Sequence, residues 1–492
     1  MTGPDDVPTA ATHWEQGDQA VVVEDRAAVA EADGLRALRS HPLFETMTTR
    51  RARRFALGNH LRSGDHWSYE STFDPRPLSL EEQAALVWAG AGVTGRVFGE
   101  LPYVDGDGPE TGGGQIMMGM VGRTHSSADA VATATLMVTS EDGTYLMPRP
   151  TDLPLDEFDR LAAMGREGRY TEIYQESRIR IADGRTEIPR VLPFTPPFNK
   201  WSSNVPGTTH LVPITDTTGL YMTILFAALG EEFAYFFHDD RDRFLRKAGI
   251  AAFGRSKGGH LYDDVKDGRV GTIDEIETYN LEICGFEQGL MIQNLALATE
   301  AMGLGGFPHY GAHRFGWLQA LGFQMRERRF SQITHQGILG TLLMKLLGKD
   351  VGIPQAVNLL RDGQPQFKPW TVPYYPTMED AVRAFVDFKF AQGKGFFRDP
   401  RQSAWKDPKR IQQTIPPYTE ANIRAVIAYC NWVMDHYGQF PGNYGPFRTL
   451  MAFQAHHIDP AFYDRFYVDG AYTDLHARHF ELWHAGEPGV GD

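Results

Sequence analysis

The sequence predicts a large globular protein of mixed α-helices and β-strands, organised around one long helix. Hydrophobic residues make up 42% of the 492 residues and aromatic residues 12%, which is typical of a packed fold. A proline-free stretch from Thr272 to Met302 is long enough for a helix of roughly 45 Å. Strand-like segments at 132–138 and 144–147 flank Asp142-Gly143, the signal of a tight turn between two strands.

The long helix is predicted to lie at the centre of the molecule. Thr272 and Glu275 match a capping box, which satisfies exposed amides at a helix start. Residues 290–302 are almost wholly apolar, and a helix that is apolar on all sides is expected to be covered on all sides. The glycine-rich segment 303–311 follows. It is either a helix C-cap with a flexible exit or a backbone turn that a flat ligand can approach closely.

Shorter patterns predict the remaining elements. Ser79 and Glu82 form a second capping pattern at the start of a helix. Five prolines between 193 and 213 predict an irregular surface crossing. Further helices are expected at 26–38, 155–164, 220–244, 315–325, 338–347, 378–390 and 420–437, a hairpin at 177–181 and 186–188, and a strand at 356–360.

Charge and composition exclude several classes of function. A formal charge of −14 leaves no basic surplus to neutralise phosphates, so a nucleic-acid-binding protein is not expected. The N-terminus lacks the apolar region of a signal peptide, and the longest uncharged apolar run is too short to cross a bilayer. Cys284 and Cys430 sit in apolar helical sequence and are expected to be buried thiols. We therefore expect a cytoplasmic protein without membrane partners.

Residues 50–54 contain four arginines in five positions. Such a run is often a solvated surface or a helix end. In an acidic protein it is also a candidate anion site, because guanidinium groups bind phosphate in fork geometry.

Four motifs, taken in this order, resemble the nitroreductase family of flavin enzymes. The segment Arg50-Arg51-Ala52-Arg53-Arg54-Phe55 is similar to the family's Arg-Arg-Ser-x-Arg-x-Phe, and 77–82 with Trp88-Ala89 is similar to its next helix. His125-Ser126-Ser127-Ala128-Asp129 resembles its Pro-Ser-Ser-x-Asn loop. The long helix ending in Gly303-Leu304-Gly305, with Pro308 and Gly311 after it, resembles the family's Gly-Leu-Gly and Pro-x-x-Gly. The resemblance covers about residues 45–150 and 272–390.

The chain departs from the family pattern at several positions. Ala52 replaces a serine, His125 a proline and Asp129 an asparagine. Tyr374-Tyr375-Pro376 stands where the family carries a basic pair, and Lys368 is the candidate substitute.

The resemblance implies an α+β sandwich, with a central, mostly antiparallel sheet flanked by helices and the long helix at a dimer interface. It divides the chain into an N-terminal tail and helix (1–44), a core in two parts (45–150 and 272–392), an insertion (151–271) and a C-terminal extension (393–492). FMN is the implied cofactor. The cofactor-binding candidates are Arg50, Arg51, Ala52, Arg54, Ser126, Ser127, Asp129, Gly305, Gly306, Pro308, Tyr310, Gly311 and Lys368.

Within this interpretation, Arg50 and Arg54 would hold the phosphate, while the two serines would hydrogen-bond the ribityl chain or the ring edge. Backbone amides near Tyr310 would face the flavin N5. Because the flavin supplies the redox chemistry, no catalytic side chain is nominated. The predicted function is an FMN-dependent oxidoreductase acting on a small organic molecule as a homodimer, with NAD(P)H or the substrate itself as the electron donor. The insertion and the tail are expected to shape a substrate pocket.

Two alternatives belong to other classes. The altered motif positions leave open a non-catalytic flavin-fold scaffold. The tail carries histidines at spacings that a metal could use, at His456-His457, His476, His479 and His484, together with Asp459. Phe453, Phe462, Tyr463, Phe466 and Trp483 surround them, so an aromatic-packed structural tail is favoured and no metal ligand is nominated.

Overall fold

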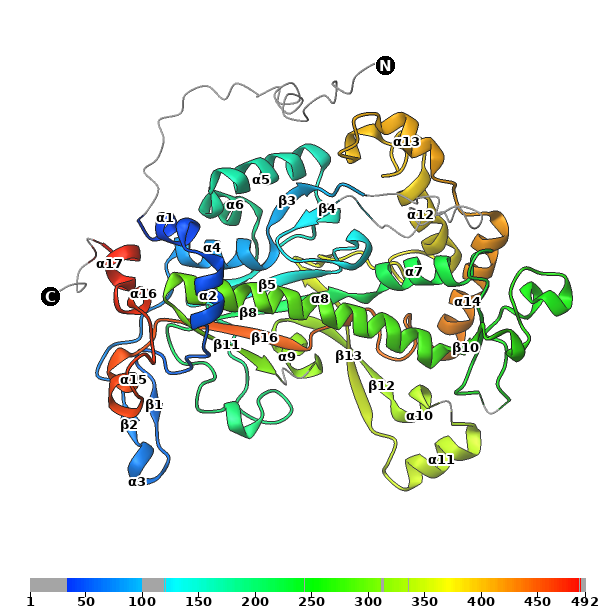
Figure 1. Ribbon diagram of the computed structural model, residues 1–492. Coiled ribbons are helices and arrows are strands. Elements are labelled where there is room, and N and C mark those ends of the chain that lie inside the picture. Colours follow the sequence, from blue (N-terminus) through cyan, green and yellow to red (C-terminus); the bar gives the residue numbers. More distant parts are fainter. Residues whose placement is uncertain are drawn as a thin grey trace, which may run out of the picture.

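A seven-stranded antiparallel sheet forms the centre of the molecule, and helices pack on its faces (Figure 1). The computed structural model describes residues 33–99, 119, 121–242, 244–310, 314–334, 336–485 and 487. The architecture confirms the predicted mixed fold with a central antiparallel sheet flanked by helices.

The helices are α1 Asp33–Ser40, α2 Leu43–Thr49, α3 Gly64–Trp67, α4 Leu80–Ala91, α5 Leu155–Glu167, α6 Tyr170–Ser177, α7 Thr217–Ala228, α8 Ile273–Met302, α9 Arg314–Ala320, α10 Phe330–Ile333, α11 Ile338–Leu346, α12 Met378–Phe390, α13 Pro408–Thr414, α14 Glu420–Tyr437, α15 Pro460–Phe466, α16 Asp474–Ala477 and α17 His479–Trp483. The strands are β1 His60–Leu61, β2 Tyr69–Glu70, β3 Val93–Arg96, β4 Val121–Arg123, β5 Ala134–Ser140, β6 Gly143–Leu146, β7 Ile179–Asp183, β8 Thr209–Asp216, β9 Phe236–His238, β10 Val270–Thr272, β11 Gly305–Tyr310, β12 Phe323–Arg329, β13 Gly352–Arg361, β14 Gln364–Pro365, β15 Phe447–Arg448 and β16 Met451–His456.

The central sheet joins strands that are far apart in the sequence. Its order is β11-β16-β8-β5-β6-β7, and β15 pairs with β8 as well. Strand β8 comes from the range assigned above to an insertion, and β16 comes from the range assigned to an extension. Both lie inside the sheet and carry buried side chains throughout most of their length. Residues 151–271 and 393–492 therefore each contribute a central strand to the sheet.

The sequence did not predict strand β8, because Pro213 counts against a strand at this position. Pro213 pairs opposite Leu136 of β5, in the middle of the strand, where a missing N–H normally disrupts a ladder. On its other side, however, β16 pairs only with Thr209 to Leu211, and β15 only with Thr215 and Asp216. Pro213 thus lies opposite the gap between two partner strands, where the loss of one donor is tolerated.

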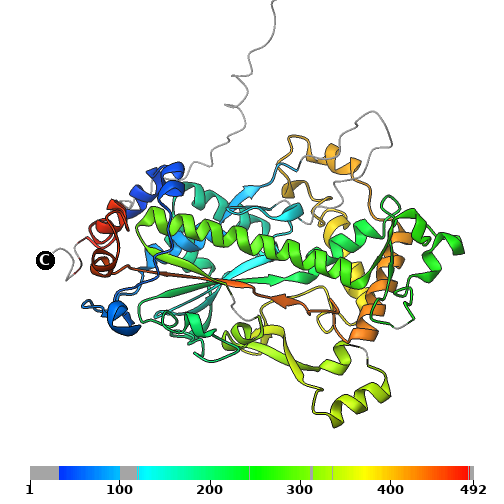
Figure 2. The ribbon, with the colours of Figure 1, turned by 60° about the horizontal axis from the view of Figure 1, so that its bottom comes forward.

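Helix α8 crosses the molecule in front of the sheet (Figures 1 and 2). It begins as predicted, because the Thr272 hydroxyl accepts a hydrogen bond from the Glu275 amide, and it ends at Gly303 in the left-handed conformation. The expectation that it is covered on all sides is wrong for the single chain. Its side chains Tyr279, Phe286 and Leu290 are 55%, 71% and 42% exposed and form an apolar stripe along one face.

Two helical groups complete the core. Helix α4 packs on α8 and α6 and shares one apolar cluster with β5 and β16. Helices α7, α12 and α14 build a second cluster, rich in aromatic side chains, at the other end of α8. Cys284 and Cys430 are both buried there as free thiols, as predicted, and burial raises the pKa of each thiol.

Several predicted elements are confirmed and others need correction. The helices at 378–390 and 420–437 have the predicted bounds. The predicted hairpin at 177–188 is wrong, because β7 pairs with β6 and residues 186–188 form no strand. The predicted helix 220–244 ends at Ala228, since the chain turns there into β9. Of the helix at 26–38, only the part from Asp33 lies within the described residues.

Helix α11 projects from the body of the molecule (Figures 1 and 2). It exposes a row of apolar side chains, among them Ile338 at 90% and Leu339 at 82%. Exposed apolar patches of this kind mark interaction surfaces in soluble proteins. None of the helices in the described residues combines the length and the apolar character needed to span a membrane.

Candidate functional site

The arginine cluster is divided between the interior and the surface. Arg53, which the sequence did not nominate, is buried and its Nη1 lies 2.5 Å from Glu300 Oε2 of α8. Arg54 lies between two rings, with its Cζ 4.8 Å from the Trp201 centroid and 4.4 Å from that of Phe307. Burial lowers the pKa of Arg54, but the guanidinium remains a cation.

The other nominated residues of this segment lie outside the packed interior. Arg50, Arg51 and Ala52 are exposed, and the Arg51 backbone amide donates to Glu300 Oε2. Arg54 donates from Nη2 to Asn199 Oδ1 and Ser202 Oγ at 3.0 and 3.1 Å. The Arg54 Nε is buried without a hydrogen-bond partner in the described residues. Arg54 is therefore held in place by the protein through Nη2 and the two rings.

The glycines after α8 belong to a strand rather than to a turn, which corrects the prediction of a glycine turn. Residues Gly305 to Tyr310 form β11 and pair in register with β16. A Cβ at Gly305 would lie 2.6 Å from Ile458 Cγ2 and 2.8 Å from the Arg53 carbonyl oxygen. At Gly306 it would lie 2.7 Å from the Phe453 ring. The missing side chains thus allow close packing against the protein itself.

Four further candidate positions are Pro308, Tyr310, Gly311 and Asp129. Pro308 pairs with Phe453 in the β11 register and is partly buried, whereas Tyr310 is placed only by its backbone at the end of β11. Gly311 lies outside the described residues, as does the side chain of Asp129.

Ser126 and Ser127 line an open cavity of about 490 Å³. One wall is residues 97–99, which follow β3, and the other is β4 with the residues that follow it. Ser126 is exposed, and the Ser127 hydroxyl accepts a hydrogen bond from the Ala132 amide at 2.8 Å. The wall also contains Arg123 and His125. A volume of this size lies within the usual range of small-molecule sites.

A buried polar chain connects this cavity to α8. His125 contacts the Gly90 carbonyl oxygen through Nδ1 at 2.9 Å and lies 3.4 Å from Glu287 Oε1 through Nε2. Burial lowers the pKa of His125, while its contact with Glu287 opposes that shift. Burial acts to raise the pKa of Glu287, but hydrogen bonds from His125 and Thr133 and the nearby charges outweigh it and lower the value. In the sequence, the only sign of these buried polar contacts is His125, which stands where the nitroreductase motif has a proline.

Lys368 lines a second, smaller cavity of about 170 Å³ with Arg149 and Asp216. Its Nζ lies 4.8 Å from the centroid of the Tyr375 ring. Val131 is part of this wall and Ala130 is part of the previous one, so the two cavities are neighbours along the chain.

The nominated residues therefore form two groups in one chain. The arginine group, residues 50–54, contacts Glu300 near the end of α8 through Arg53. The serine group, Ser126 and Ser127, follows His125, which contacts Glu287. Thirteen residues of helix separate these two glutamates, which corresponds to roughly 20 Å. A single chain does not bring Arg54 and Ser126 into contact.

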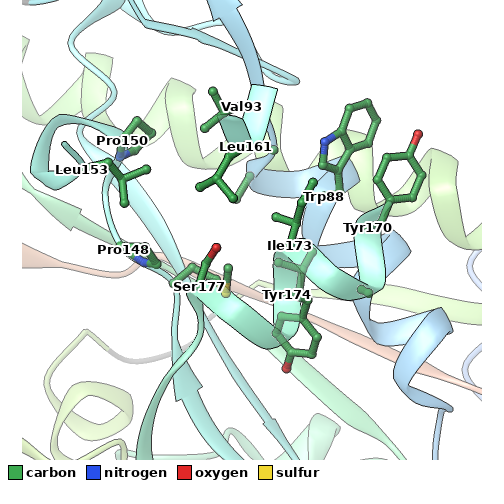
Figure 3. Close-up of a pocket in the computed structure, with 15 residues that line it drawn as sticks. Trp88, Val93, Pro148, Pro150, Leu153, Leu161, Tyr170, Ile173, Tyr174 and Ser177 are labelled. Atoms are coloured by element: carbon green, nitrogen blue, oxygen red, sulfur yellow. The ribbon is translucent and has the colours of Figure 1, made fainter. Parts of the chain in front are cut away.

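Two other cavities border the helices. An apolar one of about 40 Å³ lies among Trp88, Leu161 and Tyr174, and it holds little more than a water molecule (Figure 3). Trp88 Nε1, Tyr174 Oη and Ser177 Oγ are buried there without partners in the described residues. A larger groove of about 890 Å³ runs between α7 and α8, with Phe237, Tyr279 and Ile283 in its wall. Only the larger one has room for an organic molecule.

The tail histidines also separate into two sets. Asp459 caps α15 by accepting from the Phe462 amide, and His476 Nδ1 lies 2.7 Å from the Thr473 hydroxyl. His457, His479 and His484 instead converge on Glu82 of α4, which the sequence had placed only in a helix cap. Burial acts to raise the pKa of Glu82, but the neighbouring imidazoles, His457 first, outweigh it and hold the value well below the usual range.

Comparisons with known proteins give little beyond this geometry. No family model matches the chain, and no curated protein matches it. Among solved structures, it matches a protein from Ralstonia eutropha JMP134 described as a "putative nitroreductase". The match has 13% sequence identity and covers 60% of this chain and 79% of that chain, with a TM-score of 0.26. A likeness of this strength carries no argument about activity.

Proposed function

We propose that this protein is an FMN-dependent oxidoreductase that acts on a small organic molecule as a homodimer. The observation that carries the proposal is the polar cavity at Ser126 and Ser127, which coincides with a segment resembling the flavin-binding loop of the nitroreductase family.

The cavity wall fits a ligand that is rich in hydrogen-bonding atoms. Arg123 donates to the carbonyl oxygens of Ala91 and Ala134, yet its Nε is buried without a partner in the described residues. The Thr124 hydroxyl is likewise buried without a hydrogen-bond partner in the described residues. Because buried polar groups are almost always hydrogen-bonded, such atoms next to a cavity favour a ligand or ordered water there. The ribityl chain and ring edge of FMN offer hydrogen-bond acceptors for such donors.

Dimer formation would bring the two groups of candidate residues together. The exposed face of α8 that carries Phe286 and Leu290 continues through Gln293 to Leu297, and a two-fold contact across this part would set two copies of α8 antiparallel. Such a contact, with its axis near Gln293, would place the Glu300 end of one copy beside the Glu287 end of the other. The arginine group of one protomer would then complete the serine group of its partner. The apolar surface of α11 offers a second contact area for the same assembly.

Each group would have a separate task in this site. The flavin ring supplies the hydride and electron chemistry when it is bound. Arg54, held between Trp201 and Phe307, would place a positive charge for the phosphate. Ser126 would donate a hydrogen bond, and His125 would keep the cavity wall rigid through Gly90 and Glu287. The α7–α8 groove, built partly from residues 220–271, is the candidate space for an organic substrate.

Flavin binding is the direct test. The purified chain is expected to show flavin absorbance or to bind FMN in a calorimetric titration. Arg54→Ala is expected to weaken binding by roughly 10- to 150-fold, since one charge-assisted hydrogen bond contributes about 1.5–3 kcal/mol. Arg50→Ala and Ser126→Ala should each weaken binding less, because both side chains are exposed. Arg424→Ala, an exposed arginine on α14, is the matched control and should bind as the wild type does.

The same experiment separates the alternatives. If the wild-type protein binds no FMN in the titration, the oxidoreductase proposal falls, and the scaffold alternative stands. If FMN binds, stopped-flow reduction with NADPH and NADH will identify the electron donor. Reduction by neither would leave the organic substrate as the donor.

A further inference from the structure

Four side chains from distant parts of the chain meet in one buried cluster. Glu82 lies on α4, His457 follows β16, His479 lies on α17 and His484 follows α17. One donor atom from each lies within 4.8 Å of all the others. Glu82 Oε1 is 3.1 Å from His457 Nε2, 2.6 Å from His479 Nε2 and 3.3 Å from His484 Nε2. The four side chains are at most 3% exposed.

The far sides of two of the three rings are fixed by backbone carbonyl groups. His457 Nδ1 lies 3.0 Å from the Arg76 carbonyl oxygen, and His479 Nδ1 lies 2.8 Å from the Met302 carbonyl oxygen. A carbonyl oxygen can only accept, so both Nδ1 atoms carry a hydrogen. His484 Nδ1 lies 3.2 Å from Glu487 Oε1 but makes no hydrogen bond within the described residues. This arrangement is the one that supports histidines which bind a metal through Nε2.

The near side of the rings then contains a conflict between acceptors. In the neutral tautomer with Nδ1–H, His457 and His479 each present an Nε2 lone pair, and both lone pairs point at a carboxylate oxygen that is itself only an acceptor. Protonating both rings would bury two positive charges against one negative charge, which is costly inside a protein. A single cation among the four donors removes the conflict, because every donor can then bind it.

We propose that Glu82, His457, His479 and His484 bind one divalent transition-metal ion, with zinc as the best fit. Three imidazoles and one carboxylate are a donor set that suits zinc in a four-coordinate shell. Bonds of about 2.0–2.2 Å from a tetrahedral ion would set the donors roughly 3.3–3.6 Å apart. The contacts of Glu82 with His457 and His484 are close to that spacing, and the 2.6 Å contact with His479 would lengthen to admit the ion.

The site is of the structural type. All four positions are taken by the protein, which leaves no open position for a substrate or a reactive water. The other oxygen of Glu82 accepts from the Ser79 amide at 2.5 Å, so the same carboxylate starts α4 and binds the ion. The ion would tie the C-terminal tail to α4 and to the end of β16. Trp483, between two of the ligands, packs closely against Gly34 of α1.

Metal content and cobalt spectroscopy test the proposal on the full-length protein. The chain purified from zinc-supplemented culture is expected to hold one zinc per chain by elemental analysis. After removal of zinc with a chelator, added Co²⁺ should give the strong visible absorption of a tetrahedral site at one equivalent. His479→Ala, His484→Ala and Glu82→Gln should each retain less than about a tenth of the metal after dialysis.

His476→Ala is the matched control, because it removes a buried histidine from the same tail and leaves the four donors in place. It should retain one zinc per chain. Equal loss of metal in His476→Ala and His479→Ala would overturn the assignment of ligands. A wild-type protein with neither stoichiometric zinc nor a tetrahedral cobalt spectrum would overturn the site altogether. The wild-type spectrum decides the matter even if one of these variants fails to fold. None of these readouts depends on flavin binding.

Discussion

Replacing Gly305 by alanine tests why glycines follow α8. The new Cβ would lie 2.6 Å from Ile458 Cγ2, 2.7 Å from His456 Nε2 and 2.8 Å from the Arg53 carbonyl oxygen. A methyl group cannot be accommodated at these distances, and a backbone oxygen cannot rotate away. Overpacking of this kind costs about 1–3 kcal/mol, so Gly305→Ala should lower the free energy of unfolding by that amount. The affinity of the folded protein for FMN should change little.

Gly289→Ala provides the matched control on α8. Its Cβ would meet only Met451 Cε, at 3.9 Å, and it lies inside a helix. Alanine there should raise the free energy of unfolding by about 0.5–1 kcal/mol. Urea unfolding followed by tryptophan fluorescence measures both variants, and a calorimetric titration measures FMN binding. The reasoning is refuted if Gly305→Ala is as stable as the wild type but loses FMN, since that result would restore the interpretation of a turn open to ligand.

Three further predictions concern assembly, charge and pH. Phe286→Asp puts a charge into the apolar stripe of α8 and should halve the light-scattering mass, from twice 55.1 kDa to 55.1 kDa; a wild type that is already 55.1 kDa contradicts the dimer. Glu300→Ala leaves Arg53 buried without its ion-pair partner and should lower the free energy of unfolding in urea by about 3–5 kcal/mol. The double variant Arg53→Met with Glu300→Leu should lower it clearly less. Equal losses of free energy in the two proteins would contradict a charge effect. Burial raises the pKa of Glu277 to about 7 although the backbone amides of Gly442 and Asn443 donate to it. Because this pKa is above the unfolded value of 4.5, the stabilising contribution is complete below about pH 4.5 and is lost as the pH rises through 7. The urea midpoint should therefore fall between pH 5 and pH 8, and Glu277→Gln should flatten that slope.

Local signals in the sequence predicted the elements that depend on local physics. Caps fix helix ends through hydrogen bonds between near neighbours, so Thr272, Ser79 and Gly303 marked their helices correctly. The helices 378–390 and 420–437 were found by their apolar spacing. Strand β8 was missed because Pro213 is tolerated only through the arrangement of β15 and β16, which begin more than 200 residues later.

The candidate site shows the same limit. The resemblance named Ser126 and Ser127, and these residues do line a cavity. It did not show that Arg53 is the buried member of the arginine run, because its partner Glu300 lies on a distant helix. Glu82 was understood only as a helix cap, since its second oxygen meets histidines almost 400 residues away. Long-range pairing of this kind leaves no periodic trace in one sequence.

The order in which the ribosome releases the strands has a consequence for folding. Strand β11 ends at Tyr310, but its partner β16 does not begin until Met451. At synthesis rates of about 5–20 residues per second, β11 waits roughly 7–28 s with its edge unpaired. During that time β5, β6 and β8 can already form a sheet of local and intermediate contacts, whereas β11 presents free backbone groups that could pair with another chain. Chains released before residue 456 would lack the strand that joins β11 to β8, which makes the last tenth of the protein the step that closes its core.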